Sequence, residues 1–206
     1  MDWQYLLYSV PAVLIGLTVH EFCHGFAAYK LGDSTAKDQG RLTFNPLKHI
    51  DIIGLLFIVF AGFGWAKPVQ FNPQNLSRPR RDKALIALAG PVSNLLLGIL
   101  FCLILRFLVY VIGNDGSSQL FVHGVILLYY GAAINFGLFV FNILPIPPLD
   151  GSHIFFSGLN LRPETEQRIM RIGMPLLFVI IVIQNTTNIT ILPIGKVVDA
   201  LISLFL

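Results

Sequence analysis

Two histidines and a glutamate near the start of the chain have the spacing of a metal-dependent hydrolase. His20 and His24 are four residues apart, so in a helix their imidazole rings share one face and can reach one ion, most commonly Zn²⁺. Glu21 projects about 100° around the helix from His20 and can reach a water molecule beside that ion. The pattern predicts metal-assisted hydrolysis in which Glu21 transfers the proton.

An apolar segment, residues 3–31, surrounds this motif. At 1.5 Å per residue it would form a helix about 43 Å long, which is enough to cross a hydrocarbon core of about 30 Å. A charged side chain at the centre of such a helix costs roughly 2.5 to 3.5 kcal/mol on insertion. The sequence therefore favours a functional site inside the membrane over a chance placement of three ionisable residues.

The composition extends this interpretation to the whole chain. Of its 206 residues, 55% are hydrophobic and 12% are charged, and the mean hydropathy is +0.73. These values are typical of an integral membrane protein and exclude an ordinary soluble domain. We expect an all-α polytopic membrane protein that forms one domain over residues 1–206. Its core would be residues 1–153, followed by a loop and accessory membrane helices at 154–206.

Hydropathy predicts about five transmembrane helices, at residues 3–31, 84–112, 120–144, 172–184 and 189–206. The apolar segment 52–65 has only fourteen residues, whereas a span needs about 20, so we expect it to be re-entrant or to lie on the membrane surface. Segments 41–44 and 66–71 are predicted to form short β-strands associated with the membrane surface.

The basic residues indicate an orientation. If segment 52–65 does not cross, twelve of the fourteen Lys and Arg residues lie on one side of the membrane, and the positive-inside rule makes that side cytoplasmic. The N-terminus is then outside, and His20 lies about 15 Å into the membrane from the cytoplasmic face. The net charge of +3 therefore requires no nucleic-acid partner.

This topology brings further polar residues to a similar depth, namely Asn94 in the second crossing and Asn142 and Asp150 at the end of the third. A catalytic zinc ion typically has three protein ligands and one water molecule, so Asp150 is the candidate for the third ligand. From the residues alone, Asp150 could equally cap a helix that begins near Gly151. The side-chain amide of Asn142 is the first candidate for stabilising an oxyanion and that of Asn94 the second. Both could instead join helices through hydrogen bonds.

Taken together, three motifs resemble the site-2 protease family of intramembrane zinc metalloproteases: His20-Glu21-x-x-His24, Gly90-Pro91-x-x-Asn94 and Asn142-x-x-Pro145-x-Pro147-x-Leu149-Asp150-Gly151. Asn45-Pro-Leu-Lys-His-Ile-Asp51 and Gly64-Trp-Ala-Lys-Pro68 are similar to its short bacterial or archaeal members without a PDZ or CBS domain, although Ile53 stands where a proline is expected. The resemblance implies that His20, His24 and Asp150 bind one zinc ion per chain and that Glu21 is the catalytic acid and base.

The resemblance also implies a function. It predicts a zinc endopeptidase of a prokaryotic plasma membrane that hydrolyses a peptide bond within or next to a transmembrane segment of a membrane-protein substrate. A metal-ion carrier or permease is an alternative, but its path would continue as polar groups towards the outer face, where only Arg106 interrupts the apolar crossings. A catalytically inactive scaffold is a second alternative, and it would have no use for Glu21. The role of His153, three residues after Asp150, stays open.

Overall fold

The computed structural model describes residues 3–61, 64–112, 118–159, 161–187 and 189–206. Within these ranges, four helices are long and apolar enough to cross a membrane. They are α1 (Trp3–Lys30), α4 (Pro79–Ile112), α5 (Gln119–Asn142) and α7 (Pro163–Thr186). The chain is therefore a largely helical integral membrane protein.

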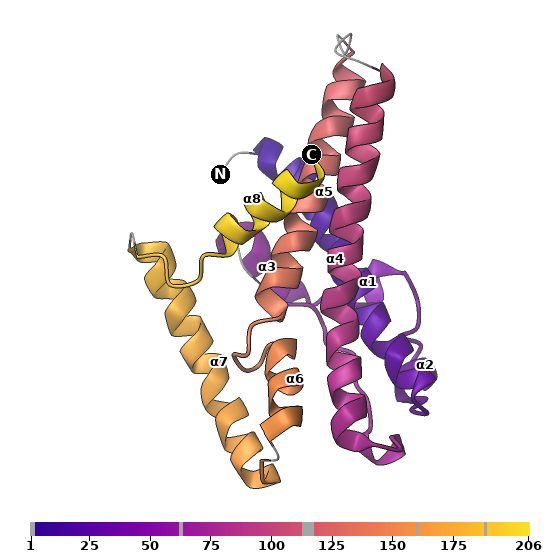
Figure 1. Ribbon diagram of the computed structural model, residues 1–206, viewed down its shortest axis with the longest axis vertical. Coiled ribbons are helices and arrows are strands. Elements are labelled where there is room, and N and C mark those ends of the chain that lie inside the picture. Colours follow the sequence, from indigo (N-terminus) through magenta and orange to yellow (C-terminus); the bar gives the residue numbers. More distant parts are fainter. Residues whose placement is uncertain (1–2, 62–63, 113–117, 160, 188) are drawn as a thin grey trace.

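Helices α1, α4 and α5 form the centre of the molecule, where α4 and α5 run side by side and α1 packs against both (Figure 1). The approach of α4 to α5 is close because Gly98 has no side chain: a Cβ atom there would lie 2.6 Å from the ring of Phe136. Phe136 is fully buried in an apolar cluster with Cys102 and Ala132. This packing sets the register of the two helices.

Helix α8 (Ile194–Phe205) completes this cluster with Val198 and Ile202. Its 12 residues make a helix about 18 Å long, well short of the roughly 30 Å hydrocarbon core. The fifth crossing predicted at residues 189–206 is therefore not confirmed, and the described part of the chain has four candidate spans.

The described residues between α1 and α4 include four short helical segments: α2 (Thr35–Asp38), η1 (Pro46–Lys48), α3 (Ile52–Ala61) and η2 (Pro73–Asn75). Helix α3 has 10 residues, about 15 Å of length, which is half of what a crossing requires. Its length agrees with the prediction that this apolar segment does not span the bilayer.

The two short strands predicted at residues 41–44 and 66–71 are not confirmed. In the described backbone, an isolated antiparallel bridge pairs Ile50 with Ala66, and the N–H of Lys67 donates to the carbonyl of His49 at 2.8 Å. The bridge does not extend into a pair of strands, because the next backbone groups form hydrogen bonds with side chains instead. Arg41 donates to the carbonyl of Lys67, and Glu21 accepts from the N–H of Val69. Pro68, between them, has no N–H to donate.

Three prolines follow α5 at positions 145, 147 and 148 and end it, since proline lacks the N–H donor and disfavours helical geometry in the preceding residue. Helix α6 (Asp150–Leu159) then begins at Asp150.

Helix α7 stands to one side of the molecule (Figure 1), and only 11% of its most apolar window is buried. It meets the proline-rich turn at Gly173, where a Cβ atom would lie 2.3 Å from Cβ of Pro147.

Candidate metal centre

Helix α1 carries three of the predicted site residues at one level of the fold. The helical spacing turns His20 and His24 towards α4, and Gly90 of α4 gives them room. A Cβ atom on Gly90 would lie 2.4 Å from Nε2 of His24 and 2.7 Å from Cε1 of His20. The glycine of the Gly90-Pro91-x-x-Asn94 motif is therefore needed because both imidazole rings occupy the space beside it.

Three potential ligand atoms converge between α1 and the start of α6. Nε2 of His20 and Nε2 of His24 are 2.9 Å apart, and they lie 3.1 Å and 3.3 Å from Oδ2 of Asp150. The two imidazole rings are nearly perpendicular, at 86°. The structure thus brings together the three residues that the sequence proposes as metal ligands.

The spacing and chemistry of these atoms fit a zinc ion. Two ligand atoms at zinc–ligand distances of about 2.0 to 2.1 Å around a tetrahedral centre are roughly 3.3 Å apart, close to the separations here. Oδ2 of Asp150 is buried and has no hydrogen-bond partner among the described residues. Because an unpaired buried acceptor is costly, its position beside two imidazole nitrogens indicates a place for a cation.

Hydrogen bonds on the far side of each ring orient the two histidines. Nδ1 of His24 donates to the backbone carbonyl of Ile86 at 2.7 Å, and Nδ1 of His20 lies 2.6 Å from Oδ1 of Asn94. Partners of this kind fix the tautomer and ring orientation of histidines that bind metals. Here they direct both Nε2 atoms towards Asp150.

Asp150 is the first residue of α6, so the helix expected under the capping alternative is present. Its Oδ2 atom faces the two imidazole rings. A carboxylate is one of the groups that bind zinc, so this orientation suits a metal ligand as well as a helix cap.

Glu21 is 8% exposed and points to a different neighbour. Its Oε2 atom accepts a hydrogen bond of 2.8 Å from the backbone N–H of Val69. Val69 belongs to the loop that follows the Ile50–Ala66 bridge. The loop backbone thus holds the carboxylate of Glu21, while the preceding residue, His20, faces the ligand cluster.

The predicted asparagines lie in different surroundings. Asn94 is fully buried and contacts His20, whereas the Nδ2 atom of Asn142 donates to the carbonyl of Leu138 on its own helix at 3.0 Å. A fully buried asparagine that the sequence analysis missed, Asn135 of α5, accepts a hydrogen bond from Nδ2 of Asn94 at 2.9 Å. A lone polar residue in the middle of an apolar crossing was the available signal for it.

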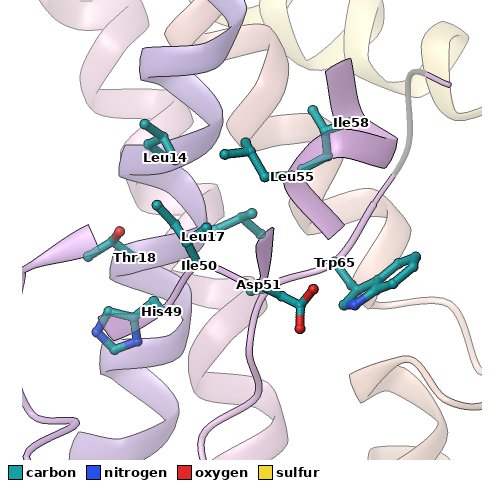
Figure 2. Close-up of a pocket in the computed structure, with 10 residues that line it drawn as sticks. Leu14, Leu17, Thr18, His49, Ile50, Asp51, Leu55, Ile58 and Trp65 are labelled. Atoms are coloured by element: carbon teal, nitrogen blue, oxygen red, sulfur yellow. The ribbon is translucent and has the colours of Figure 1, made fainter. Parts of the chain in front are cut away.

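A small cavity of about 10 Å³ lies between α1 and α3 (Figure 2). Leu14 and Leu17 of α1 line one side, and Leu55 and Ile58 of α3 line the other. This volume is about the minimum that one water molecule needs. Nδ1 of the neighbouring His49 is buried without a hydrogen-bond partner in the described part of the chain, while Nε2 donates to the carbonyl of Thr43 at 2.8 Å.

Comparisons with known proteins bear on this arrangement. The model of the family described as peptidase family M50 matches residues 8–183. The Bacillus subtilis protein YwhC, provisionally named a zinc metalloprotease, is 42% identical over 154 residues, which are 71% of this chain and 67% of that protein. Rip2 of Mycolicibacterium smegmatis, also provisionally named a zinc metalloprotease, is 33% identical over 159 residues.

A third relative is archaeal: the Methanocaldococcus jannaschii protein MJ0611, with a provisional name of the same kind, is 32% identical over 148 residues. The matched region spans 57% of the Rip2 protein and 68% of MJ0611. No solved structure matches the chain.

Proposed function

The chain belongs to peptidase family M50, and from this membership we propose that it is a zinc endopeptidase that hydrolyses a peptide bond within or next to a transmembrane segment of a membrane-protein substrate. The observation that carries the proposal is the convergence of His20, His24 and Asp150, in which Oδ2 of Asp150 is buried without a hydrogen-bond partner among the described residues. The relatives named as zinc metalloproteases support zinc as the ion.

In this proposal, His20, His24 and Asp150 hold one zinc ion per chain. When bound, zinc would supply Lewis acidity, which acidifies water and polarises a peptide carbonyl. The protein contributes the position of the ligands: the two histidines are fixed on α1, and Asp150 is held at the end of a proline-rich turn. Three protein ligands leave a fourth position for reactants, as catalytic zinc sites require.

Glu21 is the proposed general base and general acid. Its carboxylate takes a proton from the attacking water and returns it to the amine that leaves when the peptide bond breaks. The hydrogen bond from the N–H of Val69 to Oε2 leaves Oε1 available for this transfer. Glu21 needs no ligand role, because His20, His24 and Asp150 already form the cluster.

The tetrahedral oxyanion requires a hydrogen-bond donor, and we propose the amide of Asn142 at the C-terminal end of α5 for this role. One of its two amide hydrogens engages the carbonyl of Leu138, and we propose that the other donates to the substrate. Asn94 is the weaker candidate, because its Nδ2 atom donates to the carbonyl of Gly16 at 3.1 Å and to Asn135 at 2.9 Å. We assign Asn94 to the orientation of His20.

The proposed location is the cytoplasmic half of a prokaryotic plasma membrane, with the N-terminus outside. The C-terminal end of α1, the N-terminal ends of α4 and α7, and α6 lie towards one end of the molecule, opposite the C-terminal end of α4 and the N-terminal end of α5 (Figure 1). Most Lys and Arg residues lie in the segments at that end, which supports a cytoplasmic assignment. We also propose that residues 1–206 act as one domain, with the metal centre in the core at 1–153.

The test is cleavage of a reporter membrane protein by the purified enzyme in lipid vesicles. We expect cleavage by wild-type protein, loss of cleavage with a zinc chelator and recovery when zinc is added back. The Glu21→Gln variant serves as the matched control, since it should keep bound zinc but lose cleavage. Cleavage that persists in Glu21→Gln, or in metal-free protein, would overturn the proposed mechanism.

A further inference from the structure

A chain of two side-chain amides extends from the metal centre into the interface of α1, α4 and α5. Oδ1 of Asn94 lies 2.6 Å from Nδ1 of His20, and Nδ2 of Asn94 donates to Oδ1 of Asn135 at 2.9 Å. Nδ2 of Asn135 in turn donates to the backbone carbonyl of Gly131 at 2.8 Å. Both asparagines are fully buried. We call Asn94 and Asn135 the amide relay.

The backbone carbonyls at the edges of the relay determine which way each amide faces. A carbonyl oxygen only accepts hydrogen bonds, so Gly131 requires the NH₂ group of Asn135 and turns its Oδ1 towards Asn94. The carbonyl of Gly16 independently requires the NH₂ group of Asn94. A flipped Asn94 would place its oxygen against two other oxygens, Gly16 O and Asn135 Oδ1.

The direction of the relay dictates the proton position on His20. Because Asn94 presents its oxygen to His20, Nδ1 must carry a hydrogen to complete the bond. Neutral imidazole carries one ring proton, so Nε2 is left with a lone pair that faces Asp150. The tautomer that can bind a metal through Nε2 is thus selected by carbonyl groups of Gly16 and Gly131.

The two histidines differ in how this selection is made. His24 donates directly to a backbone carbonyl, that of Ile86, which no side-chain substitution removes. His20 depends on the two side chains of the relay. A carboxylate in place of Asn94 would bury a further negative charge within the membrane span, whereas the amides orient the ring without one.

We propose that Asn135 is a positioning residue, which acts through Asn94 to hold His20 in the Nδ1–H tautomer that leaves Nε2 for the metal. The proposal deepens the proposed function and rests on the metal site described there. Its central measurement, the tautomer of His20, does not require that the protein cleave any substrate.

The experiment uses full-length metal-free protein in lipid nanodiscs, labelled with ¹⁵N at the histidine rings. Long-range ¹H–¹⁵N correlation spectra distinguish a protonated ring nitrogen from one with a lone pair. In wild-type protein we expect a proton on Nδ1 of His20, and in Asn135→Leu a mixture of the Nδ1–H and Nε2–H forms. A neutral His20 ring with its proton on Nε2 in the wild type overturns the proposal without any variant, as does an unchanged tautomer in Asn135→Leu.

Zinc affinity, measured by competition with a chelating dye, tests whether Asn135 acts through Asn94. We expect Asn135→Leu to weaken zinc binding roughly 10- to 100-fold, the usual effect of losing a residue that orients a ligand. In an Asn94→Ala background the same substitution should change affinity less than about 2-fold, because the connection is already cut. An equal loss in both backgrounds would show general damage to packing and would overturn the proposal.

Asn142→Leu is the matched control for the tautomer and for zinc affinity. Asn142 lies on the same helix and also donates to the carbonyl four residues before it, that of Leu138. It is not part of the relay, so its replacement should leave the His20 tautomer and the zinc affinity as in the wild type. A change in Asn142→Leu equal to that in Asn135→Leu would contradict the special role of Asn135.

Discussion

The backbone N–H of Val69 donates a hydrogen bond of 2.8 Å to Oε2 of Glu21, although the two residues are 48 positions apart in the sequence. It joins a loop outside the helices to the proposed general base. In Val69→Pro the donor is absent, and a hydrogen bond to a charged group contributes about 1.5 to 3 kcal/mol. We expect kcat to fall roughly 10- to 100-fold while bound zinc stays at the wild-type level.

Val69→Ala is the control for this change, since it shortens the side chain and keeps the N–H. Reporter cleavage and zinc content, measured on the same preparations, separate an effect on Glu21 from an effect on the ligands. Equal kcat values for the proline and alanine variants would show that the hydrogen bond does not position Glu21 for the reaction.

Gly90→Ala should abolish metal binding by filling the space of the imidazole rings. The added Cβ would lie 2.4 Å from Nε2 of His24, nearer than unbonded atoms approach. Gly137→Ala, on α5 with open space around the added atom, should bind zinc normally and melt at the same or a slightly higher temperature. Zinc content after gel filtration checks both, and normal zinc in Gly90→Ala would contradict the geometry.

Asp150→Asn tests the third ligand without a change of shape. A neutral amide oxygen is a poorer ligand than a carboxylate, so we expect the dissociation constant for zinc to rise by more than the roughly 10- to 100-fold seen for residues that only orient ligands. Glu21→Gln, prepared in parallel, should retain zinc. Full zinc occupancy in Asp150→Asn would leave Asp150 with the role of a helix cap.

Asp33 gives a prediction for pH dependence at the loop beyond α1. Burial alone would raise its pKa, but hydrogen bonds from Thr35, Asn75 and the backbone of Asn72 lower it. A carboxyl group with a lowered pKa stabilises the fold above its ordinary pKa of about 3.9, and this contribution is lost as the pH falls through the lower folded value.

The melting temperature of wild-type protein should therefore drop more between pH 6 and pH 3 than that of Asp33→Asn. Thermal unfolding in detergent, followed by circular dichroism at several pH values, measures the difference. Asp199→Asn, at an exposed position of α8, serves as the control and should keep the wild-type pH dependence. If the melting temperature of Asp33→Asn falls with pH as steeply as that of the wild type, Asp33 is not the source of the pH dependence.

Thiol labelling tests the proposed orientation. Ser77→Cys lies just before α4 and Ser118→Cys just before α5, and both positions are exposed. A membrane-impermeant maleimide added to intact cells should label Ser118→Cys, while Ser77→Cys should react only after the cells are permeabilised. Labelling of both in intact cells would place residues 52–65 across the membrane.

The sequence predicted the parts of the site that have local patterns. The four-residue spacing fixed His20 and His24 on one helical face, and membrane depth together with the family resemblance selected Asp150. The structure brings these three residues together. Asn135 was missed because it is one polar residue in an apolar run, and its partner, 41 positions away, is recognisable only when α4 and α5 are packed.

Hydropathy predicted the helices that consist of long apolar runs. It did not predict helical segments that contain many polar residues. The fourth crossing was predicted to begin at residue 172, after a loop, yet α7 begins at Pro163 and α6 precedes it. Pro163 with acidic residues in the first helical turn is a start signal, which the apolar run from Ile172 onwards had obscured. The two predicted strands are not confirmed, and side chains of Arg41 and Glu21 bond to backbone groups that a strand pair would use.

The separation of Asp150 from the histidines has a consequence for how the protein is made. His24 and Asp150 are 126 positions apart, and ribosomes add about 5 to 20 residues per second, so the carboxylate is synthesised roughly 6 to 25 s after the imidazoles. A nascent chain that has inserted α1 still lacks α6. Under the proposed function, the nascent chain gains its third candidate ligand, and with it the proposed activity, only after this delay.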